Sequence, residues 1–158
     1  MVERVAYAVD GWGAGELGVD GAVVLWHELP AAPQVSTDGD GGVHLHNPLL
    51  DRVRRYLAGA RETFGNVELE LSWATPFQRA AIDAMRAIPY GETATYGEVA
   101  ALAGRPNAQR ALGSVCAQNR FALFVPCHRV VAADGLGSYG SLGPAYKRRL
   151  LELEGVAV

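Results

Sequence analysis

The sequence predicts a mixed α/β fold of the α+β kind: a small β-sheet domain with one helix at residues 1–74, then a mostly helical domain at residues 75–158. Short apolar runs separated by Asp-Gly turns fill the first half, as is typical of antiparallel strands. Capped segments with helical periodicity fill the second half. Of the 158 residues, 49% are hydrophobic, which is enough to bury a core without disulfides or a structural metal.

The first domain is expected to begin with a meander of two or three strands. Its apolar runs lie at residues 5–9, 17–19 and 22–26, and the dipeptides Asp10-Gly11 and Asp20-Gly21 predict the turns between them. The polar composition that follows, rich in Pro, Gly, Asp and Ser, predicts a mobile loop at residues 30–47.

A helix is predicted directly after this loop. Asn47 and Pro48 suit the N-cap and the first helical position. The apolar residues of this helix recur at helical spacing: Leu49, Leu50, Val53, Tyr56, Leu57 and Ala60. Residues 67–73 then alternate apolar and polar side chains, which predicts a half-buried strand.

Three helices with legible start and stop signals are predicted to open the second domain. Thr75 and Thr95 each begin a capping box, with Gln78 and Glu98 three residues later. Asn107 is expected to cap the third helix. The stripe expected to be buried on that helix is Ala108, Ala111, Leu112, Val115 and Cys116. The side chains expected to face outward are Gln109, Arg110, Gly113, Ser114 and Ala117.

The second and third of these helices are joined by Gly104-Arg105-Pro106 and resemble a helix-turn-helix. An ordinary helical hairpin is the other interpretation, and spacing alone favours it because such hairpins are common.

The two halves of the chain differ in net charge. Residues 1–75 hold five Arg or Lys against eleven Asp or Glu, whereas residues 76–158 hold nine against six. Only the second half is therefore a candidate partner for phosphates.

The residues with the clearest chemical potential follow an apolar run at residues 121–125, which predicts a buried strand or an extended segment. Pro126 ends the run and Cys127-His128-Arg129 comes next. A free thiol, with a pKa of about 8.5, is mostly protonated at neutral pH, so a reactive cysteine needs a neighbour that supplies positive charge or accepts its proton. His128 and Arg129 are the candidates. Neighbours in an extended chain point to opposite sides, so a direct Cys127–His128 hydrogen bond would need a turn or a bridging water. Spacing alone does not separate this nucleophile from an inert core thiol.

Cysteine usage and hydropathy predict the compartment. Cys116 and Cys127 are eleven residues apart, without the spacing of a redox pair or a disulfide framework, so a reducing cytoplasm is expected. No run of eighteen apolar residues occurs, and the first ten residues lack the features of a secretory leader. We therefore expect neither a membrane span nor a leader.

Pro126-Cys127-His128-Arg129-Val130 resembles the active-site motif of the 6-O-alkylguanine-DNA alkyltransferases, also called methylated-DNA–protein-cysteine methyltransferases. The likeness covers about residues 75–155, and the first half only in general character. The segments that carry it are residues 75–78, 88–93, 96–98, 101–104, 110–113 and 150–155, with Asn119 and Tyr139. The resemblance implies a ribonuclease H-like fold for residues 1–74.

The resemblance also implies a reaction. Cys127 would take a methyl or larger alkyl group from 6-O-alkylguanine in DNA by in-line displacement and be spent; alkylated thymine is a second candidate substrate. Glu154, His128 and a bound water would draw the proton from Cys127. Tyr139 would donate to the oxygen of the leaving guanine, and Asn119 would brace the turn before the active site. No cofactor or metal is implied, because the protein itself is the acceptor.

Double-stranded DNA is the implied partner of an expected monomer, bound at the minor groove with the damaged nucleotide turned out into a pocket. Arg110 would replace the extruded base in the stack, and Tyr96 would push the adjoining phosphate around. The candidate DNA-contacting residues are Tyr96, Gln109, Arg110, Ala111, Gly113, Ser114 and Arg129. The candidate base pocket is Tyr96, Cys127, Val130, Tyr139 and Gly140.

Several positions depart from the family pattern. Arg120 follows Asn119 where a proline is usual, and residues 138–143 replace a tyrosine followed by paired glycines, which leaves the shape of the pocket lid open. Ala81-Ile82 replaces Val-Trp. The zinc-binding cysteines of some relatives are absent from the first half, and His44 and His46 are expected to be solvated rather than metal ligands.

Three other functions fit part of the sequence. A lesion-binding module that flips alkylguanine without reacting would lack the cysteine, which is present here as Cys127. A DNA-binding regulator would use the helix-turn-helix and leave the Cys127-His128 pair unexplained. A cysteine hydrolase would turn over an ester or amide.

Overall fold

The computed structural model describes residues 1–31 and 47–158. Residues 32–46, which include most of the predicted loop together with His44 and His46, lie outside the described residues. A four-stranded sheet has the order β1-β2-β3-β4. Its strands are β1 (Val2–Val9), β2 (Gly13–Asp20), β3 (Val23–Ala31) and β4 (Glu68–Leu69). The first three are antiparallel neighbours, as the predicted meander requires, and β4 pairs with β3 in parallel.

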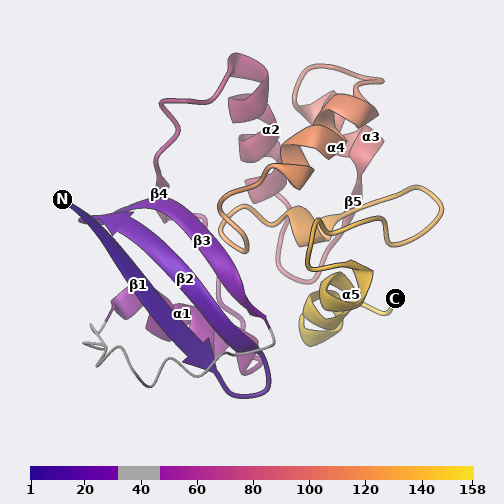
Figure 1. Ribbon diagram of the computed structural model, residues 1–158. Helices are drawn as coiled ribbons and strands as arrows, with labels where there is room; N and C mark the ends of the chain where they lie inside the picture. Colours follow the sequence, from indigo (N-terminus) through magenta and orange to yellow (C-terminus); the bar gives the residue numbers. More distant parts are fainter. Residues whose placement is uncertain (32–46) are drawn as a thin grey trace.

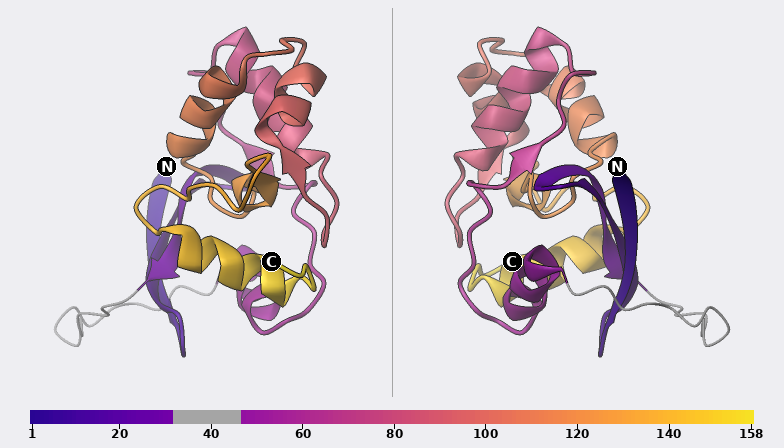
Figure 2. Two further views of the ribbon diagram at one scale, coloured as in Figure 1. Left: turned by 90° about the vertical axis from the view of Figure 1, so that its right-hand side faces the viewer. Right: turned by 90° about the vertical axis from the view of Figure 1, so that its left-hand side faces the viewer.

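The described part of the chain forms five α-helices. They are α1 (Pro48–Leu57), α2 (Pro76–Arg86), α3 (Tyr96–Leu102), α4 (Gln109–Ala117) and α5 (Pro144–Leu153). Figures 1 and 2 show α2, α3 and α4 together at one end of the molecule, with α1 and α5 at the other. None of the described helices is long and apolar enough to cross a membrane.

The predicted helix starts are confirmed where the cap is a local interaction. The Asn47 side chain accepts a hydrogen bond from the Leu49 amide at 2.8 Å and starts α1. Thr75 and Thr95 both form complete capping boxes, with Gln78 and Glu98 respectively. In each box two amides that the helix leaves unpaired are satisfied by side chains only three residues away. Ala60, expected on α1, lies beyond its end.

The expectation for Asn107 is wrong. Asn107 has a φ of 73° and makes the turn before α4, and the N-cap is Ala108, which makes no side-chain hydrogen bond. A capping side chain needs an extended backbone, whereas asparagine also tolerates the left-handed region. The buried stripe of α4 is also narrower than predicted: only Leu112 is buried, and Ala111 is exposed.

Two predicted strands are corrected. The strand expected at residues 67–73 is reduced to β4, because the chain turns at once: the Ala74 amide donates to the Leu71 carbonyl and the Trp73 indole to the Glu70 carbonyl. Residues 121–125 form a buried turn in place of a strand. Leu123 has a φ of 75°, and the Val125 amide donates to the Phe121 carbonyl at 2.9 Å. A short apolar run signals burial, and it does not identify the backbone conformation.

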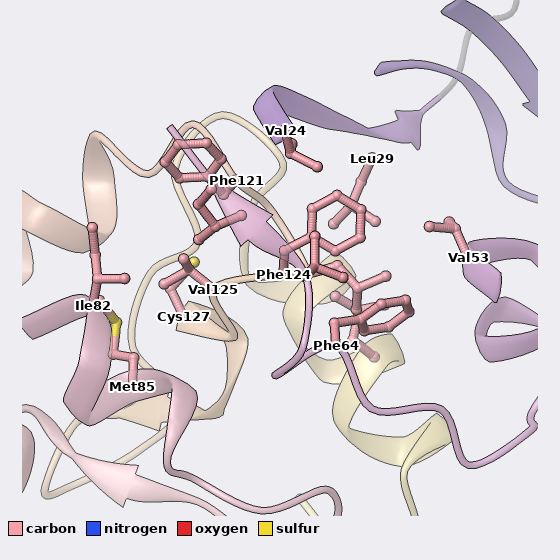
Figure 3. Close-up of a cluster of buried hydrophobic side chains, with 14 of the residues drawn as sticks. Val24, Leu29, Val53, Phe64, Ile82, Met85, Phe121, Phe124, Val125 and Cys127 are labelled. Carbon is pink, nitrogen blue, oxygen red and sulfur yellow. The ribbon is translucent and has the colours of Figure 1, made fainter. Parts of the chain in front are cut away.

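One apolar core joins the two halves of the chain. Figure 3 shows Phe121 and Phe124 of the buried turn among side chains from the sheet, α1 and α2. The labelled first-half members are Val24, Leu29, Val53 and Phe64, and the labelled α2 members are Ile82 and Met85. Ile82 thus fills the core at one of the positions that depart from the family pattern. The boundary between two domains after residue 74 remains a prediction.

His27 ties the sheet to the buried turn. Its backbone amide donates to the Arg120 carbonyl at 2.7 Å, and its Nδ1 lies 2.6 Å from the Ala122 carbonyl oxygen. A carbonyl only accepts, so Nδ1 carries the proton and Nε2 accepts from the Tyr7 hydroxyl at 2.6 Å. The ring is buried and neutral. Burial lowers its pKa from 6.5 to about 4, against the opposing effect of the Ala122 carbonyl.

This histidine makes stability depend on pH. Below about pH 6.5 the unfolded chain takes up a proton at His27 that the folded protein refuses until about pH 4. We expect this group to remove about 3 kcal/mol from the free energy of unfolding as the pH falls through that window. Urea unfolding between pH 7.5 and pH 4.5 measures the slope. His27→Gln should flatten it, and identical slopes in the two proteins would contradict the assignment.

Candidate active site

Cys127 lies in a single 3₁₀ turn, η1 (Cys127–Arg129), which follows the buried turn and Pro126. The Cys127 amide donates to the Val125 carbonyl at 2.8 Å and the Arg129 amide to the Pro126 carbonyl at 2.9 Å. The turn is followed by β6 (Val130–Val131), which pairs in parallel with β5 (Ala94–Thr95), directly before α3. The thiol is thereby fixed against the start of the predicted helix-turn-helix.

Asn119 holds the thiol in place. Its Nδ2 donates to the Cys127 sulfur at 3.1 Å and to the Val125 carbonyl at 3.0 Å, while its Oδ1 accepts from the Phe121 amide at 2.9 Å. Cys127 is 7% exposed. Burial raises the pKa of the Cys127 thiol, and the Asn119 hydrogen bond and the Lys147 charge oppose this rise. The site therefore stores a protonated thiol whose deprotonation needs a base.

His128, the next residue in the chain, is the candidate base. His128 is fully buried, and its Nε2 lies 2.7 Å from Oε2 of Glu154, the C-cap residue of α5. Glu154 is ionised, so Nε2 carries the ring proton and Nδ1 is left as an acceptor. Nδ1 has no hydrogen-bond partner among the residues that the structure describes. Burial lowers the pKa of His128 against the pull of Glu154, so the ring is neutral and able to take a proton.

Glu154 is held by donors from four residues, which come from three segments of the chain. Its oxygens accept from the Tyr56 hydroxyl at 2.5 Å, the Gly91 amide at 2.9 Å, and Arg129 at 2.9 and 3.1 Å, in addition to His128. Burial by itself would raise the pKa of Glu154, but the hydrogen bonds from His128, Arg129 and Tyr56 bring it down to about 2. The carboxylate therefore stays charged and can stabilise a protonated His128.

The expectation that Arg129 contacts DNA is corrected. Arg129 is 8% exposed, and its guanidinium donates to both Glu154 oxygens and to the Ile88 carbonyl at 2.9 Å. A side chain whose donors are committed inside the protein is not available to a phosphate. Its position beside Glu154 explains why an arginine follows His128: it neutralises a buried carboxylate.

A pocket of about 140 Å³ opens in front of the thiol. Its lining includes six of the predicted site residues: Tyr96, Gly113, Asn119, Cys127, Tyr139 and Gly140. Gly113, Cys116 and Ala117 of α4 form another wall with small side chains. The Tyr139 hydroxyl is buried without a hydrogen-bond partner among the described residues. Burial and the neighbouring Cys127 raise its pKa, so it stays protonated and can donate into the pocket. Val130, expected in this pocket, is buried outside its lining.

The remaining predicted DNA contacts lie on one surface. Gln109, Arg110, Ala111 and Ser114 are exposed on α4, next to Gly113 on the pocket wall. Tyr96 begins α3 and lines the same pocket. Figure 1 shows α3 and α4 adjacent, above the segment that carries η1. A ligand that touches the exposed face of α4 therefore lies beside the pocket mouth.

The sequence analysis did not predict two residues with polar contacts at the site, Lys147 and Tyr56. Lys147 is fully buried on α5, and its ammonium donates to the Val130 carbonyl at 2.6 Å and the Ser138 carbonyl at 3.1 Å. It thereby connects β6, which directly follows η1, to the lid around Tyr139. Helical spacing could have predicted this burial, because Lys147 lies on the same face of α5 as Leu150 and Glu154. Tyr56 was predicted as a core residue of α1, with no polar role.

A family model described as the DNA binding domain of 6-O-methylguanine DNA methyltransferase matches residues 76–156. The chain belongs to this family. A methylated-DNA–protein-cysteine methyltransferase of Methanothermobacter thermautotrophicus is 40% identical over 110 residues, which cover 70% of this chain and 61% of that protein. The aligned stretch thus spans about three-fifths of that curated relative.

Solved structures of the methyltransferase family have the same fold over nearly the full length. The O6-methylguanine methyltransferase of Mycobacterium tuberculosis is 35% identical, with a TM-score of 0.78, and the match covers 100% of this chain and 96% of that one. The M. tuberculosis protein OGT in complex with DNA is 37% identical, with a TM-score of 0.76, over 96% of this chain and 91% of that one. The mixed α/β fold and the family resemblance predicted from the sequence are confirmed.

Proposed function

We propose that this protein repairs DNA by moving a methyl or larger alkyl group from 6-O-alkylguanine to Cys127, once per molecule. The observation that carries the proposal is a thiol in a pocket wall, followed in the chain by a buried, neutral His128 that is hydrogen-bonded to the charged Glu154. The name methylated-DNA–protein-cysteine methyltransferase, carried by a relative at 40% identity, supports it. No cofactor enters the step, because the cysteine is the acceptor.

In the proposed step, one carbon–sulfur bond forms as one carbon–oxygen bond breaks. The Cys127 sulfur attacks the alkyl carbon, the carbon–oxygen bond to guanine breaks, and guanine keeps the electron pair. The thiol proton passes through a water to Nδ1 of His128, and Glu154 stabilises the imidazolium. The Tyr139 hydroxyl donates to the leaving guanine, whose negative charge grows in the transition state. The thioether on Cys127 has no leaving tendency, so the protein is not regenerated.

Double-stranded DNA with an alkylated guanine is the proposed partner, bound at the minor groove by a monomer. The exposed face of α4, with Arg110 among small residues, supports a close approach to the groove. The pocket requires that the nucleotide leave the stack. Free thiols at both Cys116 and Cys127 support a reducing, cytoplasmic location. We retain residues 1–74 as the ribonuclease H-like domain and residues 75–158 as the alkyltransferase domain.

Intact-mass spectrometry tests the proposal directly. The protein is mixed with a duplex that carries one 6-O-methylguanine, and the expected result is a gain of one methyl group per protein, mapped to Cys127. No gain, with selective binding of the damaged duplex, would support the non-reactive lesion-binding function. No gain and no preference for damaged DNA would overturn both. Repeated turnover of an ester would support a hydrolase.

Arg110→Ala should separate base extrusion from chemistry. Without a side chain to fill the gap in the stack, transfer from duplex DNA should slow about 10- to 100-fold, since unstacking a base costs a few kcal/mol. Reaction with free 6-O-benzylguanine should keep its rate, because no base has to be extruded. Arg148→Ala, which changes an exposed arginine on α5, is the matched control. Equal losses on both substrates would contradict the proposed role of Arg110.

A further inference from the structure

Tyr56 connects the first half of the chain to the chemistry of the second. It is a fully buried residue of α1, and its hydroxyl donates to Glu154 Oε2 at 2.5 Å across 98 residues of sequence. The same hydroxyl oxygen lies 3.4 Å from Nε2 of His128. Its ring meets the His128 ring edge-on at a centroid distance of 6.5 Å.

The two oxygens of Glu154 have different roles. Oε1 accepts from the Gly91 amide and from Nε of Arg129, so it is held by groups that do not change charge in the reaction. Oε2 accepts from His128 at 2.7 Å, Tyr56 at 2.5 Å and Arg129 Nη2 at 3.1 Å. The Tyr56 hydroxyl and the catalytic imidazole therefore compete for the negative charge of one oxygen atom.

Tyr56 can only act as a donor at this position. Burial, followed by the charge of Glu154, raises the pKa of Tyr56 far above its ordinary value, so the hydroxyl keeps its proton at every physiological pH. A donor that shares an acceptor oxygen withdraws charge from it. The share of that charge available to a protonated His128 is then smaller than the carboxylate alone would offer.

We propose that Tyr56 is a positioning residue that orients Oε2 of Glu154 and limits how strongly this carboxylate stabilises a protonated His128. The inference rests on the proposed function, since it concerns the relay that deprotonates Cys127. It makes α1 a contributor to the reactivity of the thiol. The chain thereby stores Cys127 as a thiol until substrate arrives, because an imidazolium that was too stable would leave a reactive thiolate in the empty pocket.

The charged and titratable groups facing the pair in the described residues come from four elements. Tyr56 comes from α1, Tyr90 from the loop after α2, Arg129 from η1, and Lys147 from α5. Arg129 and Lys147 both oppose protonation of His128, and neither is altered by a change at Tyr56. A substitution that removes the Tyr56 hydroxyl therefore leaves these other charges unchanged.

Tyr56→Phe removes that hydroxyl and keeps the ring packing against Phe64, Tyr90 and His128. The rate of iodoacetamide reaction at Cys127, mapped by peptide mass spectrometry, is measured against pH for the wild type and the variant. We expect the midpoint of the rise in rate to move about one pH unit lower, because His128 becomes a stronger base. Transfer from 6-O-methylguanine DNA should show the same downward shift. The matched control is Tyr7→Phe, which removes another buried hydroxyl, the one that donates to His27 at 2.6 Å.

The outcomes are distinct. A downward shift in Tyr56→Phe alone supports the inference. An unchanged midpoint, with only a lower melting temperature as in Tyr7→Phe, would overturn it in favour of a structural role. An upward shift would also overturn it. If the wild type transfers no methyl group, the proposed function fails, and the iodoacetamide profile still decides the role of Tyr56.

Discussion

Cys127→Ala is expected to abolish alkyl transfer completely, with no gain of mass after incubation with 6-O-methylguanine DNA. The proposed reaction forms a carbon–sulfur bond at the Cys127 sulfur, so the variant has no atom to receive the alkyl group. Binding of the damaged duplex should persist, because the exposed face of α4 and the pocket lining other than the sulfur are unchanged. Intact-mass spectrometry and fluorescence anisotropy measure the two properties separately.

Cys116→Ala is the matched control for this experiment. Cys116 lines the same pocket, and burial raises the pKa of its thiol to about 12. Its sulfur lies 3.7 Å from the Met85 sulfur. The Cys116→Ala protein should still gain one methyl group on Cys127. A gain of mass in Cys127→Ala, mapped to Cys116, would show that the pocket contains a second competent thiol and that His128 is not required.

Glu154→Gln is expected to cost both stability and rate. Removing the charge leaves Arg129 buried without its counter-ion, and breaking such a pair typically costs about 3–5 kcal/mol. The neutral amide also stabilises a protonated His128 poorly, so transfer should slow by about 10²- to 10⁴-fold, the usual contribution of general base catalysis. Urea unfolding gives the first quantity, and single-turnover transfer at a temperature where the variant remains folded gives the second.

Glu152→Gln provides the comparison, because Glu152 lies on α5 two residues away and is exposed. Glu152→Gln should change neither stability nor rate measurably.

The pKa of Glu154 is held near 2, so its contribution to stability is present above the ordinary carboxyl pKa and is lost as the pH falls toward 2. In Glu154→Gln this acid-dependent loss should disappear. If Glu154→Gln keeps the wild-type rate of transfer, Glu154 does not assist the proton transfer from Cys127 to His128.

The positions where sequence reasoning succeeded depend on near neighbours. Thr75 with Gln78 and Thr95 with Glu98 satisfy helix-end amides within four residues, so the residue types alone predict the helix starts. The Cys127-His128 pair is likewise local, and the family resemblance gave it a role. The prediction of Asn107 as a cap failed, because the choice between a cap and a left-handed turn depends on how the preceding segment enters α4.

The roles that sequence reasoning missed depend on contacts between distant segments. Tyr56 and Glu154 are 98 residues apart, and His27 and Ala122 are 95 apart. Arg129 is an obvious phosphate ligand in the sequence, yet the fold buries it against Glu154. Residues 121–125 are apolar enough for a strand, but the neighbours available to them favour a buried turn. No spacing rule relates residues that meet only after the chain has folded.

The sequence by itself determined the mixed α/β class, the capped helices and the family, and it predicts Cys127 as the nucleophile. These follow from hydrogen bonds and apolar periodicity within a few residues, or from motifs that keep their order along the chain. Only the tertiary structure decided which charges meet: that Glu154 receives donors from Tyr56, Gly91, His128 and Arg129, and that Lys147 is buried. The physical reason is that the energy of an ionised group depends on its burial and on its partners, and both are set by elements that are far apart in the chain.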